Sequence, residues 1–357
     1  MYSEDNNYLV IRLSSIGDIV LTSPLVRCLK HKNKNINIDF LVSEQFKEVV
    51  ENNPYIDNLI LYNKSLSPLQ NNSIKKNINK KYKIIDLQNN IRSKIFSNGL
   101  FLNSKDIVRF HKHRLAKLSL VYLKKEWTKL TPIPLRYIKT AEIFNISYDG
   151  RGLEFWLPNE KCLNYYPPEN RLNTTKIEKI AIAPGANHFT KRWCPEYFAE
   201  LIILLHGKYN KYNTQFVLVG GEADNIICNK IIELVNVKNR EKISIKNFAN
   251  QKSLVESAKL IDTSDLVITN DTGIMHIAAA RRVPVAAIFG STVPEFGFAP
   301  FGAPNSIISM NLPCRPCSHI GRSKCPKKHF DCMKKLYPEI VFKNITNFIN
   351  SLIKTNI

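Results

Sequence analysis

Short apolar runs alternate with helix-like periods along most of the chain. In the first half, runs rich in β-branched residues predict strands at residues 9–13, 36–42, 59–62, 84–87 and 107–110. Between the first two runs, residues 19–29 carry apolar side chains at helical intervals. Pro24 follows Ser23 there, which suits either the start of a helix or a kink within one.

The alternation lapses over residues 147–179 and then resumes. Strands are expected at residues 180–183, 216–220, 266–270 and 283–290, with helices at 195–209, 253–261 and 274–282. Strands that alternate with helices form parallel sheets through right-handed crossovers. The sequence therefore predicts an α/β protein built from two Rossmann-like, parallel-sheet domains that face each other across a cleft.

The lapse also sets the expected domain boundaries. A chain of 357 residues is too long for one ordinary core and suits two domains. We predict an N-terminal domain at residues 1–150, a linker region at 151–178, a C-terminal domain at 179–337 and a C-terminal helix at 338–357.

Composition indicates a folded soluble protein, with 44% hydrophobic and 23% charged residues. No apolar run approaches the roughly 18 residues of a membrane-spanning helix. The first ten residues, "MYSEDNNYLV", are acidic and polar, unlike a secretory signal. We therefore expect a cytoplasmic protein that is peripheral at the inner face of the membrane.

The chain has 51 Lys and Arg against 30 Asp and Glu, a formal charge of +21. Such an excess attracts nucleic acid, anionic lipid or phosphorylated substrates, although part of it reflects a Lys-rich composition. The densest basic segments are residues 75–83 and 109–129. Each can be a solvated helix face, and the second also has the apolar spacing of an amphipathic, membrane-facing helix.

The first candidate site is a glycine turn that follows the first strand, Ser14-Ser15-Ile16-Gly17-Asp18. In open α/β sheets, ligands bind beyond the carboxyl ends of the strands. Gly17 would let the backbone approach a ligand or adopt positive φ, and Asp18 would lie at the cleft. Asp18 can equally be a helix-capping residue.

The second candidate site is the turn "NDTG" between the strand at 266–270 and the helix that contains His276. Free N–H groups at a helix start bind phosphate, so Thr272 and Gly273 could hold a pyrophosphate. Asp271 fits less well beside phosphate oxygens and is expected to take a sugar hydroxyl or orient a neighbour. The alternatives are a simple capping turn and an interhelical packing role for His276.

Two further loops follow strands in the second half. The loop "PGANHFTKRW" carries Lys191 and Arg192, cations suited to a leaving diphosphate or simply solvated. In "VGGEADN", Glu222 could hold a ribose or a base edge. This turn lacks the G-x-G-x-x-G spacing of a dinucleotide site, and neither G-x-S-x-G, H-E-x-x-H nor a phosphate-binding P-loop motif occurs in the chain.

Four of the eight cysteines fall close together. They are Cys314, Cys317, Cys325 and Cys332. Four thiols at close spacing can hold a structural zinc tetrahedrally, and disulfides are not expected in a cytosolic protein. The spacing departs from the usual paired C-x2-C arrangement, so reduced free thiols are the alternative.

Taken in order, these stretches resemble the family 9 glycosyltransferases, the bacterial ADP-heptose:lipopolysaccharide heptosyltransferases. The matching segments are "IRLSSIGDIVLTSPLVRCLK", "IIDLQNNIRS", "IAIAPGANHFTKRWCPEYFAELI", "LVGGEADN" and "LVITNDTGIMHIAAARRVPVAAIFGSTVP". The segment "CRPCSHIGRSKCPKKHFDCMKKL" also looks like the cysteine-rich tail of many members. The resemblance runs from residue 8 to about residue 336.

The resemblance implies a GT-B architecture, with the acceptor mainly on the first domain and the nucleotide sugar mainly on the second. It implies inverting transfer that needs no metal or other cofactor. By similarity, Asp18 is the general base, with Ser15 and Gly17 in its turn. Lys191 would contact the donor phosphates and Glu222 would lie near the adenosine. The remaining donor-site residues implied by the resemblance are Asp271, Thr272 and Gly273, with His276 just behind.

The expected reaction moves heptose from ADP-heptose to the lipid A–Kdo inner core of lipopolysaccharide. The partners implied are an ADP-sugar donor, a phosphorylated lipid A–Kdo acceptor and the anionic inner-membrane surface. One alternative keeps the fold and changes the nucleotide sugar, with residues 187–189 as the place for such a difference. Another is a basic nucleic-acid-binding protein. Against it, no nucleic-acid-binding module is evident, so no nucleic acid is expected as a partner.

Overall fold

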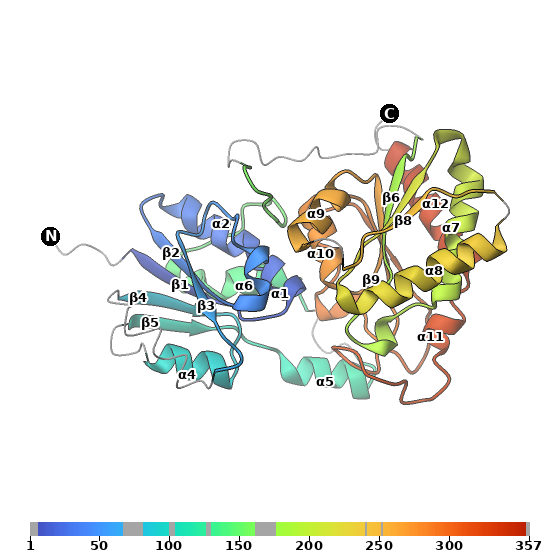
Figure 1. Cartoon of the computed structure of the whole chain (residues 1–357). Helices are drawn as coiled ribbons and strands as arrows, with labels where there is room; N and C mark the ends of the chain where they lie inside the picture. Colours follow the sequence, from blue (N-terminus) through green and yellow to red (C-terminus); the bar gives the residue numbers. More distant parts are fainter. Residues whose placement is uncertain are drawn as a thin grey trace. The chain divides into compact units, whose positions relative to one another are not determined.

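The computed structural model of the chain describes residues 6–66, 81–99, 104–125, 130–160, 176–239, 241–250 and 253–354 (Figure 1). It divides into two compact units, and each is a parallel sheet with helices on both faces. The first unit comprises Met1–His113 and Thr131–Tyr165, and the second comprises Arg114–Leu130 and Tyr166–Ile357.

The first sheet has the strand order β3-β2-β1-β4-β5, and all its pairings are parallel. Its strands are β1 (Asn7–Ile11), β2 (Asn37–Ser43), β3 (Asn58–Tyr62), β4 (Tyr82–Asp86) and β5 (Ser104–Arg109). The central strands are buried almost throughout, because helices cover both faces of a parallel sheet.

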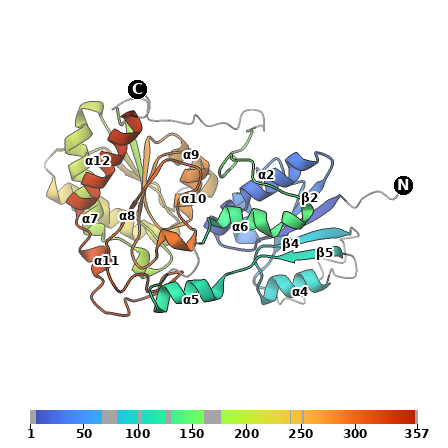
Figure 2. The ribbon, with the colours of Figure 1, turned by 180° about the vertical axis from the view of Figure 1, so that it is seen from behind.

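The helices of the first unit are α1 (Ile16–Val20), α2 (Ser23–Lys32), α4 (Ile91–Gly99) and α6 (Ile133–Thr140). Figures 1 and 2 show α2 and α6 together on one side of the sheet and α4 on the other. Pro24 lies in the first turn of α2. The single helix expected near residues 19–29 is thus two helices, because the chain turns at Leu21 and Thr22 before Pro24 starts the second.

The second sheet has the order β11-β10-β9-β6-β7-β8 and is also parallel throughout. Its strands are β6 (Lys179–Ala183), β7 (Gln215–Leu218), β8 (Ile245–Asn247), β9 (Leu266–Asn270), β10 (Val285–Ile288) and β11 (Asn305–Ile308). The two edge strands, β8 and β11, are short and partly exposed, and the hydrophobic pattern does not single them out.

The second unit's helices are α5 (Arg114–Tyr122), α7 (Pro195–Tyr209), α8 (Asn225–Lys238), α9 (Leu254–Asp262), α10 (Gly273–Ala280), α11 (Asp331–Lys334) and α12 (Pro338–Lys354). Helices α7, α8 and α12 cover one face of the sheet and α9 and α10 the other (Figure 2). Val341, Ile345 and Ile349 recur at four-residue spacing on α12 and are buried in the second unit's core.

Each sheet reverses its strand order next to its first strand. In the first unit this switch point lies between β1 and β4, and in the second between β6 and β9. Loops that leave two such neighbouring strands diverge to opposite faces and open a crevice for ligands. The turn before Asp18 follows β1, the loop with Lys191 follows β6, and the "NDTG" turn follows β9. The fold thus puts three of the predicted loops at the two switch points.

One segment is grouped differently from the predicted ranges. Residues Arg114–Leu130, which contain α5, belong to the second unit although they lie within the expected N-terminal domain at 1–150. The basic segment at 109–129 is therefore divided between the units, with 126–129 outside the described residues. Most of the basic segment at 75–83, and 161–175 of the predicted linker, also lie outside them. Among the described helices, none is long and apolar enough to cross a bilayer.

Candidate functional site

The carboxylate of Asp18 lies at the switch point of the first sheet and is paired with a buried cation. Asp18 is the third residue of the short helix α1, which begins after the Ser15 N-cap. Its Oδ1 is 2.7 Å from Nη2 of Arg12, and the two side chains are 23% and 10% exposed, respectively. The aspartate is therefore the outer member of the pair.

Arg12 is fixed from several directions. Its Nε donates to the carbonyl of Ser14 at 2.9 Å, and its Nη1 donates to the carbonyl of Leu87, just after β4, at 2.7 Å. Burial disfavours the charge of the guanidinium, but Asp18 and Tyr137 offset this, so the pKa of Arg12 is raised above its ordinary value. Arg12 is thus a permanent cation that links the ends of β1 and β4.

Asp18 also makes the contacts of a capping residue. Its Oδ2 accepts from Ser15 Oγ at 3.1 Å and from Ser15 N at 3.4 Å. These contacts hold one carboxylate oxygen at the helix start, as in a capping box. Gly17 is buried and has helical backbone, so it does not adopt the positive φ that was one of the two roles expected for it.

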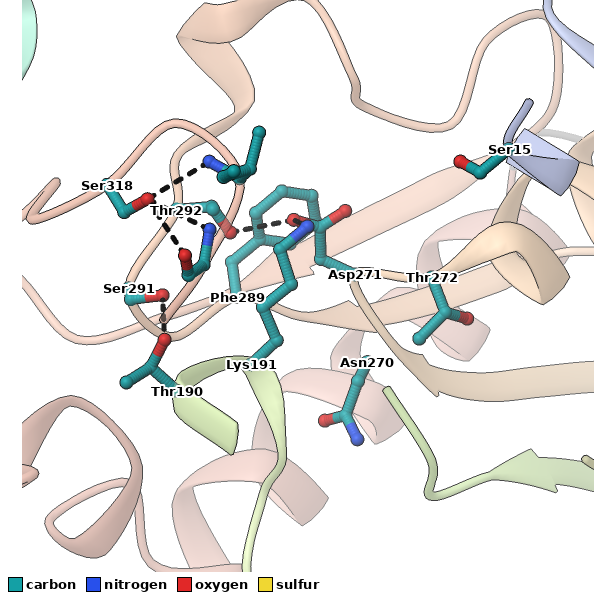
Figure 3. A network of polar contacts seen from close by, with 12 residues as sticks. Ser15, Thr190, Lys191, Asn270, Asp271, Thr272, Phe289, Ser291, Thr292 and Ser318 are labelled. Atoms are coloured by element: carbon teal, nitrogen blue, oxygen red, sulfur yellow. Dashed lines mark hydrogen bonds and ion pairs between the residues drawn. The ribbon is translucent and has the colours of Figure 1, made fainter. Parts of the chain in front are cut away.

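In the second unit, Lys191 and Asp271 form an ion pair across the switch point. Nζ of Lys191 is 2.7 Å from Oδ2 of Asp271, and the side chains are 16% and 8% exposed, respectively. Thr292 Oγ1 also donates to this oxygen at 2.7 Å (Figure 3). Here the lysine is the more exposed member of the pair, and the less exposed aspartate fixes the position of its ammonium group.

Asn270 ties together the two loops that carry this pair. It is completely buried at the end of β9. Its Nδ2 donates to the carbonyl of Pro184 at 2.7 Å, and its Oδ1 accepts from the Trp193 amide at 3.2 Å. One side chain therefore fixes both ends of the loop that contains Lys191 to the turn that contains Asp271.

The start of α10 lies directly after Asp271. Thr272 is its N-cap and Gly273 its first residue, and no side chain caps this end within the described contacts. The first amides of an α-helix have no intrahelical acceptor and attract anions. His276 lies one turn further along and is buried, at 3% exposure. Lys191, Asp271, Thr272 and Gly273 thus come together at one edge of the sheet.

The predicted adenosine contact, Glu222, is exposed in the short 3-10 helix Glu222–Asp224. Its neighbour Asp224 instead packs between the loops that follow β6 and β7. A Cβ atom on Gly185 would lie 2.0 Å from Asp224 Oδ1, and one on Gly220 would lie 2.7 Å from Asp224 Cβ. These two glycines are therefore needed for the aspartate to fit. Burial raises the pKa of Asp224, while the Gly221 amide and Arg192 act in the opposite direction.

The cysteine-rich segment contacts the loops that support the Lys191–Asp271 pair. The Arg315 guanidinium donates to four carbonyl oxygens, those of Phe289, Gly290, Thr292 and Met310. Thr292 is the residue that holds Asp271. Burial lowers the pKa of Arg315. The acceptors of its hydrogen bonds are neutral carbonyl groups, which stabilise the positive charge less than a carboxylate would.

The same segment also holds the residue before Lys191. Thr190 Oγ1 accepts from the Arg322 amide at 2.8 Å and from Ser291 Oγ at 2.8 Å. Gly321 lies against His188, since a Cβ atom there would lie 2.6 Å from His188 Cβ. Phe189 stacks on Phe330 with ring centroids 4.7 Å apart. The loop at 187–190 is therefore shaped by residues more than 100 positions further along the chain.

The four cysteines of this segment do not form a ready metal site. All are free thiols, and Cys332 is buried while the other three are partly exposed. No group of three or more His, Cys, Asp or Glu side chains in the described part of the chain is arranged to hold a metal ion. A zinc ion at these positions stays a prediction from their spacing alone, and no step of the reaction below depends on it.

Several residues of the site were not singled out by sequence reasoning. They are Arg12, Thr190, Asn270, Thr292 and Arg315. Arg12, Thr190 and Asn270 lie inside the quoted motifs, so their position next to a candidate was a usable signal. Thr292 and Arg315 also lie inside quoted segments, but their link to the ion pair depends on contacts with other loops, which spacing does not reveal.

The two switch points offer complementary chemistry. The first presents a carboxylate that can accept a proton, and the second presents an ammonium group beside free helix amides that can stabilise a growing negative charge. Nothing in either arrangement supplies an activated serine or cysteine nucleophile.

A family model, "Glycosyltransferase family 9 (heptosyltransferase)", matches residues 73–328. The lipooligosaccharide heptosyltransferase 2 of Campylobacter jejuni subsp. jejuni serotype O:2 is 28% identical over 344 residues, which cover 94% of this chain and 96% of that protein. The chain belongs to glycosyltransferase family 9, the heptosyltransferase family, and is a glycosyltransferase.

Solved structures show the same fold. A family 9 glycosyltransferase from Veillonella parvula DSM 2008 superposes with a TM-score of 0.73 at 20% identity and covers 98% of this chain and 99% of its own. The Escherichia coli "ADP-heptose lps heptosyltransferase II" has a TM-score of 0.68 at 18% identity, with 97% and 99% covered. The fold is GT-B, as the resemblance to the family implied.

Proposed function

We propose that this family 9 glycosyltransferase transfers heptose from ADP-heptose to the lipid A–Kdo inner core of lipopolysaccharide. The transfer inverts the anomeric centre and needs no metal ion. Support comes from the family itself, and from the names of the Campylobacter and Escherichia coli relatives, which specify lipooligosaccharide, lipopolysaccharide and ADP-heptose.

The observation that carries the proposal is the opposite order of exposure in two ion pairs. Asp18 is more exposed than Arg12, whereas Lys191 is more exposed than Asp271. An inverting transfer needs a base for the acceptor hydroxyl and a cation for the departing diphosphate. Each unit therefore contributes one of the two charges that the reaction requires.

On the acceptor side, Asp18 acts as the general base. The acceptor oxygen attacks the anomeric carbon, and its proton passes to the carboxylate as the new bond forms. Arg12 and Ser15 fix the direction of the carboxylate, with Arg12 on Oδ1 and Ser15 on Oδ2. Serine or asparagine at position 18 would cap the helix but would not take this proton.

On the donor side, the bond between the anomeric carbon and the diphosphate breaks and ADP leaves. Lys191 and the first amides of α10 stabilise the charge that grows on the diphosphate. Asp271 orients the ammonium group of Lys191, the second of the two roles considered for it from sequence. Because this charge comes from the protein, we propose a reaction without a metal.

The adenosine is proposed to lie at the loops after β6 and β7, next to Asp224 and Glu222. His276 supports the start of α10 from within the core. The protein is proposed to work at the cytoplasmic face of the inner membrane, where the lipid acceptor is anchored.

A donor screen tests the proposal. Purified protein is mixed with lipid A–Kdo and, in turn, ADP-, UDP- and GDP-linked sugars, and nucleotide diphosphate release is followed with and without EDTA. We expect release from ADP-heptose alone, unchanged by EDTA, and an inverted anomeric centre in the product by NMR. Preferred discharge of another nucleotide sugar would assign a different donor to the same fold, and tight nucleic-acid binding without donor affinity would reject the enzyme assignment.

A further inference from the structure

Helix α5 carries an exposed apolar stripe. Leu115, Leu118 and Tyr122 recur at i, i+3 and i+7, so they share one face of the helix, and they are 78%, 45% and 69% exposed. Leu123 follows at 55% exposure. A surface helix normally turns such a stripe toward the core, so an outward stripe marks an interaction surface.

The rest of α5 is held against the second unit, to which it belongs. Ser119 and Val121 are buried. The ammonium group of Lys124 donates to the carbonyls of Cys314 and Pro316 at 3.2 and 2.6 Å, and that of Lys117 lies 5.7 Å from the centre of the Phe298 ring. Figures 1 and 2 show α5 beside the loop that precedes α11. The stripe is therefore a fixed feature of a docked helix.

Cations surround this stripe. Between Lys112 and Lys125 the sequence contains five Lys or Arg residues and no Asp or Glu. Arg114 and Lys125 are themselves exposed. An apolar stripe with basic flanks is the pattern of a helix that lies in the surface of an anionic bilayer. Nine residues are too few to span the membrane, so the helix would lie in its plane.

We propose that the face of α5 formed by Leu115, Leu118 and Tyr122 docks the protein on an anionic lipid bilayer. A bilayer fits better than a second copy of the chain. Two copies packed through the same face would bring the exposed cations Arg114 and Lys125 of each towards those of the other, whereas acidic headgroups neutralise them. The purpose of this docking rests on the proposed function, since the acceptor lipid is itself held in a membrane.

The test is co-sedimentation with vesicles that contain about 30% phosphatidylglycerol in phosphatidylcholine, compared with vesicles of phosphatidylcholine alone. Wild type is expected to bind the anionic vesicles and to be released by about 0.5 M salt. The double variant Leu115→Ser/Leu118→Ser is expected to bind at least about fivefold more weakly. Arg114→Gln/Lys125→Gln should also bind more weakly, and its residual binding should depend less on salt.

Matched controls exist in the same unit. Ile226 and Val237 are 82% and 84% exposed on α8, so Ile226→Ser/Val237→Ser removes at least a comparable exposed apolar surface elsewhere. Lys242→Gln/Lys246→Gln removes two exposed charges away from α5. Both controls are expected to bind vesicles like wild type. Thermal unfolding and light scattering of every variant report its folding and its oligomeric state.

Three outcomes would overturn the proposal. Wild type could fail to bind anionic vesicles, the α5 variants could bind as wild type does, or the controls could weaken binding equally. A dimer that dissociates in Leu115→Ser/Leu118→Ser would assign the stripe to a second copy. ADP affinity, measured by calorimetry on the same samples, separates this proposal from the proposed function. Vesicle binding through α5 without ADP affinity would overturn the proposed function alone.

Discussion

The two units use the same local design with the charges reversed. In each, an aspartate follows a central strand at the switch point of a parallel sheet and lies 2.7 Å from a cation. In the first unit the cation is the less exposed partner, and in the second the aspartate is. Because the outer member of each pair is the one that can reach a substrate, one unit offers a negative charge and the other a positive one.

The comparison shows that an acidic turn alone does not define a role. Asp18 and Asp271 both follow short strands and both lie near the start of a helix, and a motif search treats them alike. What distinguishes them is the origin of the partner cation. Arg12 comes from the end of the same strand and is less exposed than Asp18. Lys191 comes from the loop after the neighbouring strand and is more exposed than Asp271.

Removing the outer carboxylate should have the largest effect. Asp18→Asn keeps the size of the side chain and removes its ability to accept a proton. We expect turnover to fall by about 100-fold or more, because a positioned base contributes about this much. Steady-state release of ADP measures the turnover.

ADP affinity of Asp18→Asn, by calorimetry, should stay within about twofold of wild type, because Asp18 belongs to the other unit. Asp86→Asn is a suitable comparison, since Asp86 is a second, fully buried carboxylate at the end of β4. If Asp18→Asn turned over normally, the assignment of the base would be wrong.

Removing the outer cation should have the next largest effect. Lys191→Met keeps most of the length of the side chain and removes its charge. ADP binding should weaken by about tenfold, since a charge-assisted contact to the phosphates is lost. Calorimetry with ADP and with adenosine measures this.

Adenosine lacks phosphates, so its affinity should be unchanged in Lys191→Met. Equal weakening of both ligands would indicate that the loop had lost its shape and would remove the phosphate contact as the explanation. Lys230→Met, which removes an exposed lysine on α8 paired with Glu196, serves as the matched control.

Replacing Arg315, which is connected to Lys191 through Thr292 and Asp271, should have a smaller effect on ADP affinity. Arg315→Lys keeps a positive charge but cannot donate to four carbonyls at once. Because Thr292 and Asp271 connect this arginine to Lys191, ADP affinity should fall by about fivefold. In the Lys191→Met background, Arg315→Lys should lower ADP affinity by less than about twofold, as expected for coupled residues.

Arg281→Lys is the matched control for Arg315→Lys. Arg281 is a buried arginine at the far end of α10, where it pairs with Asp262 at 3.0 Å. The Arg281→Lys substitution should lower the unfolding temperature without changing ADP affinity. Additive losses in the double variant Arg315→Lys/Lys191→Met would show that Arg315 acts on binding independently of Lys191.

The smallest effect should come from Asp224, the partly buried carboxylate between the two glycine loops. The folded protein holds a proton on Asp224 more tightly than the unfolded chain, because burial raises its pKa above 3.8. Its contribution to stability is therefore lost as pH rises through the folded pKa. In Asp224→Asn, the free energy of unfolding in urea should fall less steeply than in wild type as pH rises above 3.8.

Glu222→Gln, at the exposed neighbour of Asp224, should leave that pH dependence unchanged. A steeper dependence in Asp224→Asn would mean that the aspartate is stabilised in its charged form, contrary to its burial.

Much of the fold could be read from the sequence because parallel strands are continuous apolar runs. The strand at Leu266–Asn270 and the helix at Pro195–Tyr209 have the predicted bounds. The edge strands β8 and β11 were not predicted, since three or four half-exposed residues carry little hydrophobic pattern. The assignment of α5 to the second unit could not be predicted, because its partners Cys314 and Pro316 lie about 190 residues away.

The sequence allowed us to predict which turns carry the residues of the candidate site. The motif residues Lys191, Asp271, Thr272 and Gly273 do lie together, because the loops after β6 and β9 leave neighbouring strands. Sequence did not reveal which partner of each ion pair faces outward. That order depends on residues such as Thr292 and Arg315, whose importance is a matter of packing and not of spacing.

The support from Arg315 has a consequence for synthesis. A ribosome delivers the loops around Lys191 and Asp271 well before it delivers position 315, so those loops emerge without the side chain that later anchors their carbonyls. Helix α5 must wait longer still for Cys314 and Pro316, whose carbonyls accept from Lys124. A nascent chain that stalls before position 315 would lack this support for the loops of Lys191 and Asp271.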